Sequence, residues 1–163
     1  MKFLADCMLG KLTRWLRILG YDVKYLNNAE DKELVEIALK GRRVLLTRDY
    51  DLSNRARALG AESFCIKGVD EIDELFEMKE EFKIELDVDT DNSRCPKCNA
   101  EIAAVPKDKV ENRIPESTAR FYNEFWICAD CDQIYWQGSH WKRILETLNK
   151  VKNKIETSMI ENV

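Results

Sequence analysis

The sequence predicts an α/β protein in which a parallel sheet flanked by helices is followed by a small metal-binding module. Over the first 82 residues, short apolar segments typical of strands alternate with amphipathic helical segments, a pattern that favours a parallel sheet. In the second half, two Cys-x-x-Cys pairs lie 29 residues apart, at Cys95/Cys98 and Cys128/Cys131. A chain of 163 residues has room for one ordinary domain and one small module of this kind.

The expected strands and helices follow from apolar periodicity and from glycines placed to end helices. Strands are expected at residues 2–5, 23–26, 44–47 and 63–66. The first helix is indicated by helical spacing of Leu9, Leu12, Leu16 and Leu19 before Gly20. Further helices are expected at residues 31–41, 51–59 and 70–82.

The two cysteine pairs predict a structural zinc site. Each Cys-x-x-Cys turn directs two thiolates to one point, and four thiolates make the tetrahedral cage that Zn²⁺ takes in closed sites. We therefore expect a first domain at residues 1–90 and a zinc ribbon at 94–143 that folds separately from it. Residues 144–163 are expected to form a helical or frayed basic tail.

Acidic residues follow the predicted strands, where sites form in parallel α/β sheets. Asp6 follows the first strand, Asp49 and Asp51 follow the third, and Asp31 opens the helix after the second. A site made of oxygen ligands suits Mg²⁺ or Mn²⁺, which activate water and steady the leaving oxygen in phosphoryl transfer. Asp31 and Asp51 equally fit the alternative role of helix N-caps.

Basic residues accompany this acidic edge. Lys11, Arg14 and Arg17 lie along one side of the first predicted helix, and Arg48 follows the third strand. They could form a phosphate-binding rim or simply an exposed, solvated helix face. In the ribbon, His140 could contact a base or make a structural hydrogen bond, and one or two of the many aromatic residues could stack on bases while most form the core.

The net charge of −4 is local to one segment. Residues 68–91 hold 2 Lys and Arg against 11 Asp and Glu, whereas residues 1–67 hold 13 against 9, so a polyanionic partner is not excluded. No apolar run is long enough to span a membrane. Because four cysteines fit a zinc cage and Cys7 and Cys65 lie in apolar segments, we expect a reducing, cytoplasmic location.

Several motifs resemble the PIN-like ribonuclease domain family named after the C-terminal part of the Mut-seven exonuclease. They comprise Phe3-Leu4-Ala5-Asp6-Cys7-Met8-Leu9-Gly10-Lys11-Leu12, Trp15-Leu16-Arg17-Ile18-Leu19-Gly20-Tyr21-Asp22, Leu45-Leu46-Thr47-Arg48-Asp49, Arg94-Cys95-Pro96-Lys97-Cys98-Asn99, and Cys128 and Cys131 followed by Tyr135-Trp136-Gln137-Gly138-Ser139-His140-Trp141. The resemblance covers residues 1–143. It implies a PIN-like domain with a C-terminal zinc ribbon and metal-dependent RNA cleavage.

The resemblance also implies roles for individual residues. Asp6 matches the acidic residue after the first strand, and Asp49 matches the one in the Thr-x-Asp motif. Asp31 matches an intermediate acidic position for which Glu36 is a rival, and Asp51 falls where related sequences often have an acidic residue. The expected function is a metal-dependent ribonuclease with RNA as partner. The alternatives are a non-catalytic RNA- or ribosome-binding protein, or a zinc ribbon that docks a protein partner.

Overall fold

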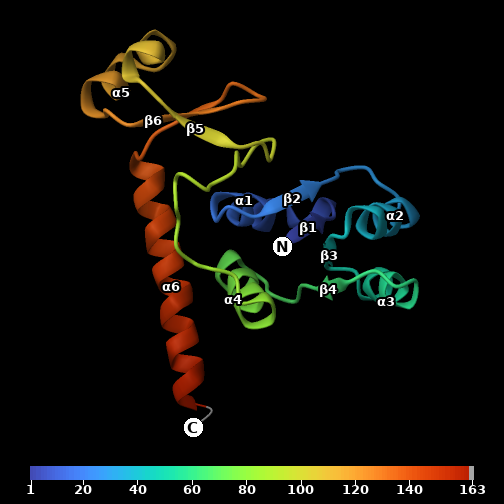
Figure 1. Cartoon of the computed structure of the whole chain (residues 1–163). Coiled ribbons are helices and arrows are strands. Elements are labelled where there is room, and N and C mark those ends of the chain that lie inside the picture. Colours follow the sequence, from blue (N-terminus) through green and yellow to red (C-terminus); the bar gives the residue numbers. More distant parts are fainter. Residues whose placement is uncertain (162–163) are drawn as a thin grey trace.

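The computed structural model describes residues 1–161, and its centre is a four-stranded parallel sheet (Figure 1). The strands lie in the order β2-β1-β3-β4, with bounds Lys2–Ala5 (β1), Asp22–Tyr25 (β2), Val44–Thr47 (β3) and Ser63–Cys65 (β4). Ala5 pairs with both Tyr25 and Leu46, and Thr47 pairs with Cys65. The carboxyl ends of the strands therefore meet at one edge. The predicted fold class is confirmed, although β2 begins and ends one residue earlier than expected.

Helices cover both faces of this sheet. The first face packs against α1 (Gly10–Ile18) and α4 (Glu71–Phe82), and the second against α2 (Asp31–Gly41) and α3 (Tyr50–Ala58). Successive side chains of a strand point to opposite faces of the sheet, so each face has its own apolar cluster. Phe3 and Ala5 lie in the cluster on the first face, and Leu4 lies in the cluster on the second. All three are fully buried, and burying a side chain as large as leucine contributes about 1.5–3 kcal/mol.

The helix starts differ from those expected. The N-cap of α3 is Asp49, whose side chain accepts hydrogen bonds from the amides of Asp51 and Leu52. The capping role predicted for Asp51 is therefore wrong. At α2 the N-cap is Glu30, without a side-chain hydrogen bond, so Asp31 lies inside the first turn and is not a cap either. These assignments matter because they leave the carboxylates of Asp31 and Asp51 free of a capping role.

The chain leaves α1 at Gly20, where the backbone takes the left-handed conformation (φ +91) and the segment around Asn92 approaches closely. A Cβ at this position would lie 2.9 Å from the carbonyl oxygen of Asn92, in the segment that leads to the first cysteine pair. Only glycine combines the left-handed conformation with the absence of a side chain.

The second half of the chain contains a three-stranded antiparallel sheet. Its strands β5 (Ile102–Val105), β6 (Phe125–Cys128) and β7 (Ile134–Tyr135) lie in that order. Between β5 and β6 the chain forms two short 3₁₀ helices, Lys107–Lys109 and Glu111–Arg113, and α5 (Glu116–Phe121). A small separate core of Val110, Phe125 and Ile134 holds this part together.

The last helix, α6 (Ser139–Glu161), packs against the first part of the chain (Figure 1). Leu148, Val151 and Ile155 are buried in the same cluster as α1 and α4. Lys152 binds Asp87 at 2.6 Å, and Lys154 binds Asp73 on α4. Of the two alternatives expected for the tail, the structure shows a continuous helix to Glu161; residues 162–163 lie outside the described part. Within residues 1–161, no helix combines the length and apolar character needed to cross a membrane.

Candidate functional site

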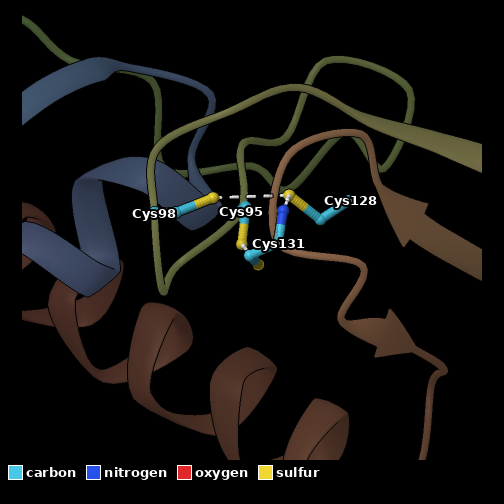
Figure 2. A group of neighbouring side chains, drawn as sticks. All are labelled: Cys95, Cys98, Cys128 and Cys131. Carbon is cyan, nitrogen blue, oxygen red and sulfur yellow. Dashed lines mark hydrogen bonds between the residues drawn. The ribbon is translucent and has the colours of Figure 1, made fainter.

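Four cysteine sulfurs gather where the ribbon meets the first part of the chain (Figure 2). Cys98 Sγ lies 3.4 Å from Cys128 Sγ, and Cys95 Sγ lies 3.6 Å from Cys131 Sγ. All four sulfurs lie within 4.8 Å of one another. Sulfurs bound to one Zn²⁺ at about 2.3 Å would be about 3.8 Å apart in a tetrahedron, so this cluster fits a four-coordinate zinc ion.

Local hydrogen bonds favour metal binding at Cys95. Burial raises the pKa of this thiol, but the Tyr135 hydroxyl, 3.0 Å away, and the amides of Cys98 and Lys97 outweigh burial and lower the pKa to about 7. Because the thiolate is the form that binds metal, the lowered pKa assists binding at Cys95, whereas burial raises the pKa of Cys98 to about 12, so that a metal ion must displace a proton there. The cage can hold a metal but offers no open position for a substrate.

Arg17 joins the first cysteine pair to the sheet. Its guanidinium donates to the carbonyls of Pro96 (3.0 Å) and Lys97 (3.2 Å), and also twice to the carbonyl of Val23 in β2 (3.1 and 2.8 Å). Arg17 is only 6% exposed. The prediction that it belongs to an exposed RNA-binding stripe is therefore wrong, because all its contacts are to backbone carbonyls inside the protein.

Asn99 makes a second connection between β2 and the turn of the first cysteine pair, residues 95–98, which we call the knuckle. Its backbone adopts φ 75, a conformation that asparagine tolerates better than most residues. Its side chain accepts a hydrogen bond from the Val23 amide at 2.9 Å and donates one to Asp22 at 2.8 Å. Arg43 also binds Asp22, at 2.8 Å. Burial raises the pKa of Asp22, but hydrogen bonds from Arg43 and Asn99 outweigh it and hold the pKa at about 2.

A buried threonine links two of the predicted catalytic residues at the carboxyl edge of the parallel sheet. Asp6 is 6% exposed; one of its oxygens accepts from the Met8 amide and the other from the Thr47 hydroxyl. The Thr47 oxygen in turn accepts from the main-chain amide of Asp49 at 2.9 Å. Thr47 therefore connects the Asp6 carboxylate after β1 to the main chain of Asp49 after β3, whereas the Asp49 carboxylate caps α3.

The other predicted acidic residues lie outside this link. Asp31 pairs with Arg55 of α3 at 3.1 Å, and Glu36 pairs with Lys40 on the exposed side of α2. Asp51 is exposed at the first turn of α3. Within residues 1–161, the four cysteines are the one group of three or more potential ligands clustered closely enough for a metal, and the acidic residues do not form such a group.

Three of the predicted basic residues line a cavity of about 710 Å³, and Cys7 and Met8, which follow Asp6 in the sequence, line it too. Lys11 and Arg14 reach it from α1, and Arg48 from the end of β3. Arg48 is bound to Glu74 of α4 at 2.5 Å. Burial raises the pKa of Glu74, and the hydrogen bond from Arg48 only partly counteracts this. The lining thus holds three cations and three carboxylates, those of Asp70, Glu71 and Glu74; Arg48 is paired within it, while Lys11 and Arg14 form no ion pair within residues 1–161.

Sequence reasoning missed Thr47, Glu74 and Asn99 as contributors to these sites. Thr47 was visible only as part of a Thr-x-Asp motif, and Asn99 only as the residue after a cysteine pair. Glu74 is one of many acidic residues on α4, and nothing in the sequence marked it as the buried one.

Fold and site together define an α/β protein with a parallel sheet and a four-cysteine metal cage. The family model described as Mut7-C RNAse domain matches residues 1–148, and the chain belongs to this family. The family resemblance seen in the sequence is thereby confirmed, and the family points broadly to ribonuclease-type activity. Neither the curated proteins nor the solved structures gave a significant match.

Proposed function

We propose that this chain is a metal-dependent ribonuclease of PIN-like type that cleaves RNA phosphodiesters at the carboxyl edge of the parallel sheet. In this proposal Asp6 and Asp49 hold Mg²⁺ or Mn²⁺, and the cysteine cage holds structural Zn²⁺ in a cytoplasmic protein. The observation that carries the proposal is that Thr47 binds both the Asp6 carboxylate and the Asp49 amide, so that these two residues lie at one sheet edge, near a cavity whose lining includes Lys11 and Arg14.

The two carboxylates retain capacity for a cation. Asp49 uses Oδ1 to accept from the amides of Asp51 and Leu52, while its Oδ2 has no hydrogen-bond partner within residues 1–161. Each Asp6 oxygen accepts one hydrogen bond, although a carboxylate has about four lone-pair sites. Mg²⁺ commonly keeps several waters and binds one or two carboxylates together with substrate phosphates, which suits this pair.

The chain's own residues would position the RNA. Lys11 and Arg14 would hold phosphates along the cavity, and Arg48 would join them on leaving Glu74. Asp51 would add a further oxygen ligand to the cation. Asp31 could do so on leaving Arg55, and Glu36 is its rival for this role. The bound cation would supply an activated water and neutralise charge on the phosphate.

The decisive experiment compares RNA cleavage in Mn²⁺ by the wild type and Asp49→Asn. Asparagine keeps the Oδ1 that caps α3 and caps nearly as well as aspartate, so the fold should be retained while the charge is lost. We expect cleavage to be abolished, with thermal stability unchanged or raised in the absence of the cation. A matched control is Asp108→Asn, an exposed carboxylate in the ribbon, which should cleave like the wild type. Equal cleavage by Asp49→Asn would reject the proposed site.

A non-catalytic RNA-binding protein is the second candidate. It is favoured by the absence of a three-carboxylate cluster within residues 1–161 and by the Arg55–Asp31 pair, in which an arginine neutralises one of the candidate carboxylates. This alternative predicts RNA binding by both the wild type and Asp49→Asn, and cleavage by neither.

A further inference from the structure

All four tryptophans of the chain line one cavity of about 830 Å³, which lies between α1, the ribbon and the first turns of α6. Tyrosines complete the aromatic lining. The six rings are those of Trp15, Trp126, Trp136, Trp141, Tyr122 and Tyr135. A cavity of this size could take a planar aromatic group of a ligand.

These rings are only partly taken up by the ribbon's core. Tyr122 and Trp136 pack against that core, yet Trp15, Trp136 and Trp141 remain partly exposed around the cavity. Trp126 also lines the cavity but is buried. The cavity therefore offers partly exposed aromatic side chains to a ligand.

The charged groups around the cavity are mostly basic. Arg94 and Arg143 line it, and Glu71 is the one acidic residue in its lining. Arg143 Nη2 lies 2.7 Å from His140 Nδ1. Since a guanidinium only donates, Nδ1 of His140 accepts this hydrogen bond, which holds Arg143 beside the cavity.

The aromatic cavity adjoins the cavity that Lys11 and Arg14 line. Glu71 lines both, and its carboxylate accepts from Trp15 Nε1 at 3.5 Å. On α1, Arg14 lines this neighbouring cavity and the next residue, Trp15, lines the aromatic one. A strand lying across α1 could therefore occupy both cavities.

We propose that the aromatic cavity is a base-stacking subsite for single-stranded RNA. It would hold one unpaired nucleobase against the tryptophan rings, with the adjoining phosphates at Arg94 and Arg143, while the strand continues over Lys11 and Arg14. The subsite rests on the proposed function in taking RNA as the substrate. Stacking on aromatic rings beside a basic groove is the way single strands are bound without a sequence requirement.

The test measures quenching of tryptophan fluorescence in the full-length, zinc-loaded protein. An Asp49→Asn background prevents cleavage, so that binding is measured alone. The probes are a single-stranded oligouridine and an abasic oligonucleotide of equal length. We expect the oligouridine to quench and to bind more tightly, because only it offers a base. In this background Trp141→Ala should weaken oligouridine binding about 5- to 100-fold, the loss expected for one stacked base.

Phe121→Ala is the matched control, because Phe121 is a 75% exposed ribbon aromatic outside the cavity lining. It should bind like its parent, and zinc content and thermal stability should be alike in all variants. Equal binding of the two probes, or an equal loss in Phe121→Ala, overturns the subsite. Quenching by an aromatic peptide but not by RNA would also overturn it and indicate a protein-docking cavity.

The outcomes separate this inference from the proposed function. Quenching by oligouridine together with absence of cleavage in the wild type would reject catalysis and support the subsite. Cleavage by the wild type without base-dependent quenching would overturn the subsite and leave the catalytic proposal standing.

Discussion

Individual polar side chains connect separate parts of this molecule. Thr47 is fully buried, yet its hydroxyl both donates to Asp6 and accepts from Asp49. Arg17 is almost as buried and donates only to main-chain carbonyls. Each of these groups is hydrogen-bonded, as buried polar groups must be to avoid a large desolvation cost.

Glu74→Gln tests the ion pair between Arg48 and Glu74. Because burial raises the pKa of Glu74 above its ordinary value in the unfolded chain, its ionised form costs stability in the fold. This cost is absent at low pH and develops as pH rises through the unfolded and then the folded pKa. We expect the stability of Glu74→Gln, measured by urea unfolding relative to the wild type, to improve as pH rises from about 4.5 toward 7.

The same substitution should release Arg48 and strengthen RNA binding. Glu80→Gln is the control, since it removes the same charge from an exposed position of the same helix. A gain in RNA affinity for both variants would reflect only the change in net charge. A gain for Glu74→Gln alone would support the role of Arg48.

At the scale of elements, the first cysteine knuckle secures an edge strand. In β2 the Val23 amide donates to the Asn99 side chain, and the Val23 carbonyl accepts from Arg17, which also binds the knuckle. The sequence led us to expect a ribbon that could unfold and leave the first domain intact. The structure changes this expectation, because part of the support of β2 comes from the knuckle.

Zinc removal should therefore loosen β2 as well as the ribbon. Since metal binding and folding are coupled in such sites, we expect Cys98→Ser, or chelation, to unfold the ribbon and speed amide hydrogen exchange in β2. β4 is the internal control, because it is the other edge strand and does not contact the knuckle. Protection that stays unchanged in β2 would show that the strand does not depend on the zinc knuckle.

At the scale of the whole molecule, the two ends of the chain share one core. α6 contributes Leu148, Val151 and Ile155 to the cluster that covers one face of the parallel sheet. Its lysines Lys152 and Lys154 also pair with the acidic segment around α4. Part of the local negative charge seen in the sequence is thereby neutralised.

Leu148→Ala tests whether α6 stabilises the first domain. Leu148 is 2% exposed, and truncating a buried leucine typically costs about 2–5 kcal/mol. Leu145→Ala, one turn earlier and 42% exposed, should cost far less. Urea unfolding followed by circular dichroism would measure both. Similar small losses in the two variants would mean that α6 adds little to the stability of the sheet domain.

The sequence by itself determined the elements of the first half and the four-cysteine cluster, because both depend on local spacing, but it did not locate the strands of the ribbon. Apolar periodicity located four strands and four helices to within about two residues, and the Cys-x-x-Cys spacing identified the ligands that the fold brings together. The positions of Asp6 and Asp49 after adjacent strands followed from the common direction of a parallel sheet.

Only the tertiary structure decided which polar side chains are buried and what they bind. Arg14 and Arg17 look alike in the sequence, yet one lines a cavity while the other lies between the knuckle and β2. Asp49 rather than Asp51 caps α3, because the cap depends on the backbone conformation at the end of β3. The tryptophans, spread from residue 15 to residue 141, meet at one cavity because α1, the ribbon and α6 pack together. Such contacts join residues distant in the chain, and local sequence patterns do not encode them.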